Sequence, residues 1–164
     1  MIKKLFLTLG LLGMFSVCKG QESTPVMPQG KLLRVEYAYH GMRMAEFSDF
    51  DLKRSADKGD SKFSFRHYSS DVSVDGIADS LFSAAYRIIE EERMYEYGSS
   101  YQMPPEIEQG MLDGFSWRFD AYFENGEHLS SSGRHVMPDG HGLRRIEKLL
   151  YDAAEAVTNA TLDK

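Results

Sequence analysis

The chain has 164 residues, 42% of them hydrophobic, and a formal net charge of −6 at pH 7. This length suits one domain with its own hydrophobic core, and the acidic balance argues against a nucleic-acid partner, which requires basic surface. The single cysteine excludes a disulfide within the chain.

Residues 1–20 have the pattern of an export signal. Lysines precede an apolar run of 13 residues at 5–17, which is too short to anchor in a bilayer, where about 20 are needed. We expect cleavage after Gly20, which leaves no transmembrane segment and removes three lysines, so the charge becomes −9. A lipoprotein anchored through Cys18 is the alternative. Either way the protein is expected to be exported, to the periplasm or the outside of the cell.

Residues 21–30 are rich in proline and small residues, which predicts a flexible tether. Residues 31–160 are predicted to form one domain. At its start, apolar residues alternate with polar ones over residues 33–40, which predicts the first strand. The same pattern, interrupted by a turn, predicts a hairpin of two strands near residues 48–55 and 62–68.

Two amphipathic helices are predicted, because apolar residues recur every three or four positions over residues 75–96 and 142–160. Ser73 or Asp75 could cap the first helix. Between the helices, residues 99–114 contain prolines and glycines that predict a long loop. Loops of this length are often functional, so this segment is the best place to expect a binding surface.

An aromatic β-hairpin follows that loop. Residues 115–123 alternate aromatic and polar side chains, which predicts a half-buried strand. Asn125-Gly126 predicts the turn, since both residues tolerate positive φ. Together these elements predict an α+β domain, in which an antiparallel sheet of about five strands packs one face against the two helices.

The register of this hairpin depends on the length of its loop. A two-residue loop would place Leu129 on the polar side of the sheet. A three-residue loop with Gly126 in the left-handed conformation would pair Ala121 with Leu129 and Trp117 with Gly133. We favour the second register, because it returns Leu129 to the core and sets the largest side chain over a glycine.

Tyrosine is abundant in the chain, and it supplies contact area at a low cost in entropy. Trp117 has two interpretations: it is a core residue above Gly133, or it lies on an open face where it can stack on a sugar or a peptide. The candidate ligand-binding residues are Trp117, Tyr101, Tyr122 and Arg118. The expected ligand is a protein, a peptide or a glycan, and no cofactor is expected.

His135, Asp139 and His141 form a second candidate site, because two imidazoles and a carboxylate in one turn could hold a metal ion. The alternative is an ordinary turn in which Asp139 helps to start the last helix. The chain has no G-x-S-x-G motif, no glycine-rich phosphate loop and no cysteine after residue 18. No catalytic residue is therefore predicted, and a small hydrolase or metal-binding protein at this turn is the alternative function.

Turn and core residues give the chain a resemblance to known proteins. They are Gly41, Trp117-x-Phe119, Phe123, Asn125-Gly126, Ser132-Gly133 and Pro138, followed by the closing helix. With them the chain resembles a type of small exported bacterial domain to which no activity is assigned. The resemblance implies the fold and the export. The function that we expect is an exported, non-catalytic binding or accessory domain of the bacterial periplasm or cell surface.

Overall fold

The computed structural model describes residues 25–41, 45–57, 59–108 and 114–162, and the predicted export signal lies outside them. The strands are β1 (Leu32–His40), β2 (Phe47–Arg54), β3 (Ser61–His67), β4 (Ser70–Asp75), β5 (Ser100–Gln102), β6 (Ser116–Phe123) and β7 (His128–Arg134). The helices are α1 (Asp79–Glu91), the 3₁₀ helix η1 (Met94–Glu96), α2 (Pro105–Glu108) and α3 (Gly142–Leu162). No helix among the described residues is long and apolar enough to cross a membrane.

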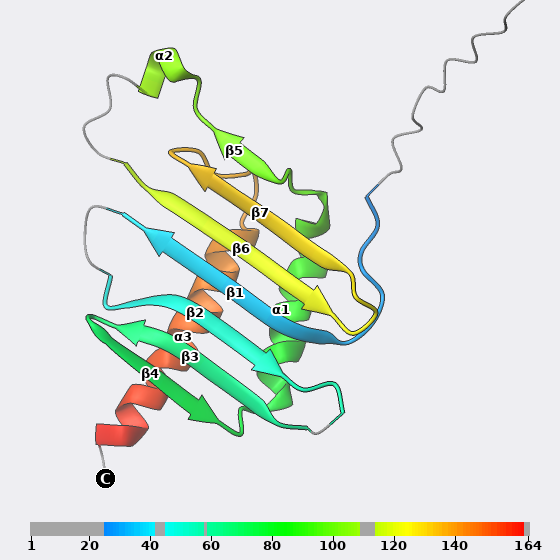
Figure 1. The fold of residues 1–164 in the computed structure, drawn as a ribbon, viewed down its shortest axis with the longest axis vertical. Coiled ribbons are helices and arrows are strands. Elements are labelled where there is room, and N and C mark those ends of the chain that lie inside the picture. The colour runs from blue at the N-terminus through cyan, green and yellow to red at the C-terminus, as the bar shows by residue number, and fades with distance from the viewer. Residues whose placement is uncertain (1–24, 42–44, 58, 109–113, 163–164) are drawn as a thin grey trace, which may run out of the picture.

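The seven strands of the described residues form one sheet in the order β4-β3-β2-β1-β6-β7-β5, and every pair is antiparallel except β5 with β7. The two long helices pack against each other and lie on the same side of this sheet (Figure 1). The predicted α+β class is confirmed. The sheet has seven strands rather than about five, because β4 and β5 were not predicted.

Strand β4 contains both residues that were predicted to cap the first helix, Ser73 and Asp75. Val72 and Val74 alternate with polar residues and pair with β3, and Gly76 follows in the left-handed conformation with φ +74°, which favours glycine. Because α1 begins only after this turn, neither Ser73 nor Asp75 caps it. The last residues of the predicted helix form η1 instead.

The hairpin of β6 and β7 has the favoured register. Ala121 pairs with Leu129 and Trp117 with Gly133, and Gly126 has a φ of +84°. The three-residue loop therefore returns Leu129 to the side of the helices, where Trp117, Phe119 and Phe123 of β6 are buried. This register also decides which polar residues meet on the opposite side.

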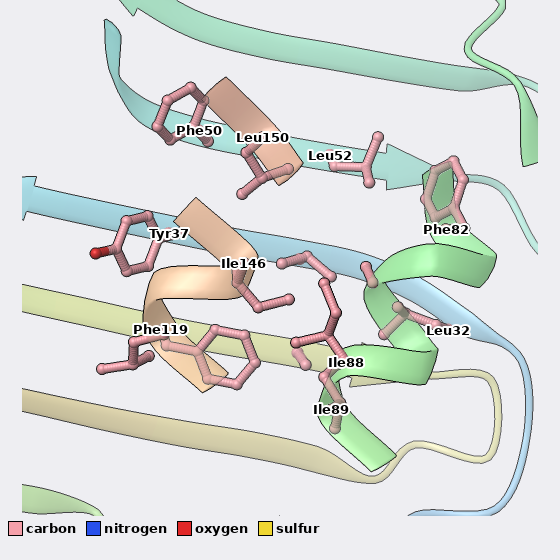
Figure 2. Close-up of a cluster of buried hydrophobic side chains, with 14 of the residues drawn as sticks. Leu32, Tyr37, Phe50, Leu52, Phe82, Ile88, Ile89, Phe119, Ile146 and Leu150 are labelled. Atoms are coloured by element: carbon pink, nitrogen blue, oxygen red, sulfur yellow. The ribbon is translucent and has the colours of Figure 1, made fainter. Parts of the chain in front are cut away.

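The core lies between the sheet and the two long helices (Figure 2). The largest buried side chains include Tyr37, Leu52, Phe63, Phe82, Ile89, Phe119, Ile146 and Leu150. Burial of each large apolar side chain contributes about 1.5–3 kcal/mol to stability. The predicted apolar faces of both helices supply their share of this core, with Phe82 and Ile89 from α1 and Ile146 and Leu150 from α3.

Strand β2 contains a bulge that brings two phenylalanines to the same side. A strict alternation would put Phe47 and Phe50 on opposite faces of the sheet. The pairing with β3 shifts between Ser48 and Asp51, and Asp49 has a φ of +52°. This extra residue lets both phenylalanine rings reach the core.

Candidate functional site

The side of the sheet opposite the helices carries polar side chains on its central strands. Alternation along each strand, which buries the apolar residues against α1 and α3, sends the intervening residues to this side. We call it the polar face. It comprises Arg34, Glu36, Asp51, Lys53, Lys62, Ser64, Arg66, Arg118, Asp120, Tyr122, His128 and Ser130.

Asp120 lies at the centre of the polar face and has no exposed surface. Its carboxylate accepts hydrogen bonds from the Arg118 Nε at 2.5 Å and from the His128 Nε2 at 3.0 Å, and it also interacts with the Ser130 hydroxyl. Burial by itself would raise the pKa of Asp120, but the hydrogen bonds from these three partners outweigh burial and lower it. Asp120 is therefore held as a carboxylate.

Tyr122 and Arg34 extend this network toward β1. The Tyr122 ring stacks on the His128 ring, with centroids 4.2 Å apart and planes 8° from parallel. The Arg34 guanidinium lies 5.7 Å from the centre of the Tyr122 ring and donates hydrogen bonds to Asp51 at 2.7 Å and to Glu36 at 2.9 Å. These contacts fix the orientation of both rings and of the guanidinium.

The charges on the polar face form rows that cross the strands. Arg34 pairs directly with Lys53, and Lys53 in turn with Lys62. The next row is acidic, since Glu36 pairs with Asp51 on one side and with Asp120 on the other. Like charges directly opposite each other destabilise a sheet. The ion pairs between the two rows, such as Arg34 with Asp51 and Lys53 with Asp51, offset this cost.

Asp120 and His128 do not form a catalytic triad with Ser130. In a triad the serine hydroxyl donates to the histidine, whereas the Ser130 hydroxyl here interacts with the carboxylate. What the arrangement provides is a pair of polar side chains held in place by one carboxylate. The Arg118 side chain keeps 65% of its surface exposed and that of His128 keeps 39%, so both can bind a ligand without losing their hold on Asp120.

Among the described residues, two hollows adjoin the charged rows of the polar face. One of about 180 Å³ is lined by Glu36, Ala38, Asp49, Asp51 and Arg118 among others, and it is smaller than the sites that hold small molecules. The other, of about 640 Å³, lies beyond Lys53 and Lys62 and also contains Asp60 and Asp75. The basic row thus leads from the centre of the sheet into the larger hollow.

The four predicted ligand-binding residues lie in two places. Trp117 is only 2% exposed, and its indole N–H donates to the Val136 carbonyl at 2.7 Å. The Tyr101 ring packs on Trp117 at 5.8 Å. Arg118 and Tyr122 belong to the polar face. Of the two interpretations of Trp117, the structure shows the core residue, and only Arg118 and Tyr122 face the open side.

The turn with the three candidate metal ligands does not bring them together. The His135 ring lies edge-on to Phe115, and the His141 backbone N–H donates to the Glu92 carboxylate, while Asp139 is exposed. Among the residues that the structure describes, no group of three histidine, cysteine or acidic side chains is placed to hold a metal ion.

Asp120, His128 and Ser130 were not among the candidates from the sequence. A signal for them was present, because the favoured register of the hairpin sets Asp120 opposite Ser130 and Tyr122 opposite His128. A buried carboxylate opposite a hydroxyl and beside an imidazole could have been found from this pairing alone.

Comparison with known proteins finds no relative of the chain. No protein-family model, no curated protein and no solved structure matches the chain. A function has to follow from the geometry of the chain's own residues.

Proposed function

We propose that the chain is an exported, non-catalytic binding or accessory domain of a bacterial envelope and that it takes its ligand on the polar face. The buried carboxylate of Asp120 is the observation that carries this proposal. A charge that has lost its contact with water is costly unless several partners hold it. Here Arg118 and His128 form hydrogen bonds to it, while 65% of the Arg118 side chain and 39% of the His128 side chain stay exposed. Side chains fixed before binding lose little entropy when a ligand arrives.

The shape of the polar face favours an extended ligand. Its basic row runs across the strands from Lys62 and Lys53 to Arg34, and the pairing continues through Tyr122 to His128. Neighbouring strands lie about 4.8 Å apart, so this row spans about 20 Å. A peptide or a glycan strand can cover this length, and the stacked rings of Tyr122 and His128 provide a surface for a sugar or an aromatic side chain.

The test is a binding screen with the full chain on peptide and glycan arrays, followed by titration of the tightest ligand. We expect Arg118→Ala and His128→Ala each to weaken binding about tenfold, which corresponds to about 1.4 kcal/mol. The matched control is Lys148→Ala, which removes an exposed cation on the helix side and should leave binding unchanged. No saturable ligand, or equal effects of all three variants, would contradict the proposal.

Export is a separate part of the proposal, and it rests on the pattern of residues 1–20. Mass spectrometry of the protein recovered from the cell envelope would give its mature N-terminus. A chain that starts at Gln21 supports cleavage by the general signal peptidase, and a lipid-modified Cys18 supports the anchored form. An uncleaved chain in the cytoplasm would contradict export.

A further inference from the structure

The hairpin between β3 and β4 places an aromatic residue where the turn favours glycine. His67 pairs with Ser70, so Tyr68 and Ser69 form a two-residue loop. Tyr68 has a φ of +51°, and Ser69 is not among the residues with positive φ. Positive φ at the first loop residue alone is typical of a type II′ turn, which usually has glycine there. For a bulky side chain this conformation is strained.

Burial of the Tyr68 side chain does not offset this strain, since Tyr68 is 53% exposed. Its ring is instead the outermost of three rings that pack in series. The Phe47 ring is buried and stacks on the His67 ring at 5.0 Å, and the His67 ring contacts the Tyr68 ring at 4.8 Å. The stack holds Tyr68 in place and leaves its outer side to solvent. Strained residues that are held in place in this way are often functional.

A carboxylate lies beside these rings. Glu46 accepts a hydrogen bond from the Tyr151 hydroxyl at 3.1 Å and lies 3.7 Å from the His67 Nε2, while its backbone carbonyl accepts from the Tyr68 N–H at 2.9 Å. A second acid, Glu155 on α3, acts on Tyr151 as well. We call Glu46, Phe47, His67, Tyr68 and Tyr151 the Tyr68 corner. It lies where β2 begins, next to α3, and is separate from the polar face.

We propose that the Tyr68 corner binds an arginine or lysine side chain from a basic segment of a partner protein. The face of a tyrosine ring attracts a cation, and the Glu46 carboxylate can take the hydrogen bonds of the same guanidinium or ammonium group. The net charge of −6 draws a basic partner to this protein rather than an acidic one. The strain at Tyr68 then has a reason, because glycine would suit the turn but would remove the ring.

Tyr68→Gly tests the backbone strain and the binding separately, because it should increase thermal stability and decrease the affinity for a basic peptide. The variant should raise the Tm of the full chain by a few degrees, since glycine relieves the turn. It should also weaken binding of an N-acetylated hexa-arginine peptide at least fivefold, measured by titration calorimetry at fixed ionic strength. Tyr68→Phe keeps the ring and should match the unmodified protein in peptide affinity.

Because an acidic protein can attract a basic peptide anywhere, acid variants locate the site. Glu46→Gln should weaken peptide binding more than Glu90→Gln, which removes an exposed acid from α1. A hexa-glutamate peptide should not bind. The proposal is overturned if Tyr68→Gly lowers the Tm, if it leaves the affinity unchanged, or if the two glutamate variants have equal effects.

Discussion

The two faces of the sheet are formed by the same strands, but the buried residues of each face are covered by different kinds of groups. On β6, Phe119 is 1% exposed and Asp120, the next residue, is 0% exposed. Phe119 is covered by apolar side chains beneath the helices, whereas Asp120 is covered by the groups that donate hydrogen bonds to it. The apolar face tolerates small changes of partner. The polar face depends on specific hydrogen-bond donors to Asp120.

The largest expected effect of a single change is on the apolar face. Phe119→Ala removes a ring from the centre of the core and should reduce the free energy of unfolding by about 3–5 kcal/mol. Urea unfolding at pH 7, followed by fluorescence or circular dichroism, measures this loss. A loss below about 1 kcal/mol would show that the helices do not cover this face in solution.

Asp120→Asn tests the hydrogen-bonded carboxylate of the polar face, and it keeps the shape of the side chain. We expect a loss of about 1–3 kcal/mol at pH 7, because the amide offers one acceptor oxygen instead of two and carries no charge to pair with Arg118. The loss should depend on pH. The folded state lowers the pKa of Asp120, so the contribution of the carboxylate is present above its ordinary pKa of about 3.9 and disappears as the pH falls through the lower folded value.

Urea unfolding of both proteins at several pH values between 7 and 3 measures this dependence. The two stability curves should approach each other at the acid end. A difference that stays constant over the whole range would mean that the charge of Asp120 does not contribute.

The smallest expected effect concerns a carboxyl group on the helix side of the sheet. Glu147 on α3 interacts with Tyr37 of β1, and burial raises the pKa of Glu147 although Arg144 and the Tyr37 hydroxyl act to lower it. No hydrogen bond of ordinary geometry reaches the Tyr37 hydroxyl from the described residues, so its contact with Glu147 is mainly electrostatic.

An acid with a raised folded pKa destabilises the protein when it is charged. Stability should therefore fall as the pH rises above the ordinary glutamate pKa of about 4.3. Glu147→Gln cannot ionise, so it should be more stable than the unmodified protein at pH 7, by about 0.5 kcal/mol, and equal to it near pH 4. Thermal unfolding at the two pH values checks this, and a variant that is less stable at pH 7 would contradict it.

The parts of the fold that sequence patterns predicted are those with strong local signals. The turn at Asn125-Gly126 and the single aliphatic residue Leu129 were enough to predict the register of β6 and β7. Strand β4 was missed because the alternation around Val72 and Val74 covers only six residues, and the helical pattern of α1 follows after a short turn. The bulge at Asp49 is set by pairing with β3 rather than by any local signal.

The candidate sites were harder to predict, because they depend on which strands become neighbours. Spacing along the chain suggested His135, Asp139 and His141, which the fold does not bring together. The link from Asp120 to Glu36 requires β6 to lie beside β1, a pairing between strands about eighty residues apart. No local pattern specifies such a pairing.

Mapping a bound ligand by NMR tests the role of the polar face most directly. Amide chemical shifts of the full chain would be recorded with and without the tightest ligand from the arrays. We predict that the largest changes fall on β1, β6 and β7 around Arg34, Arg118 and His128. Changes concentrated on the outer sides of α1 and α3, with the polar face unaffected, would contradict the proposal.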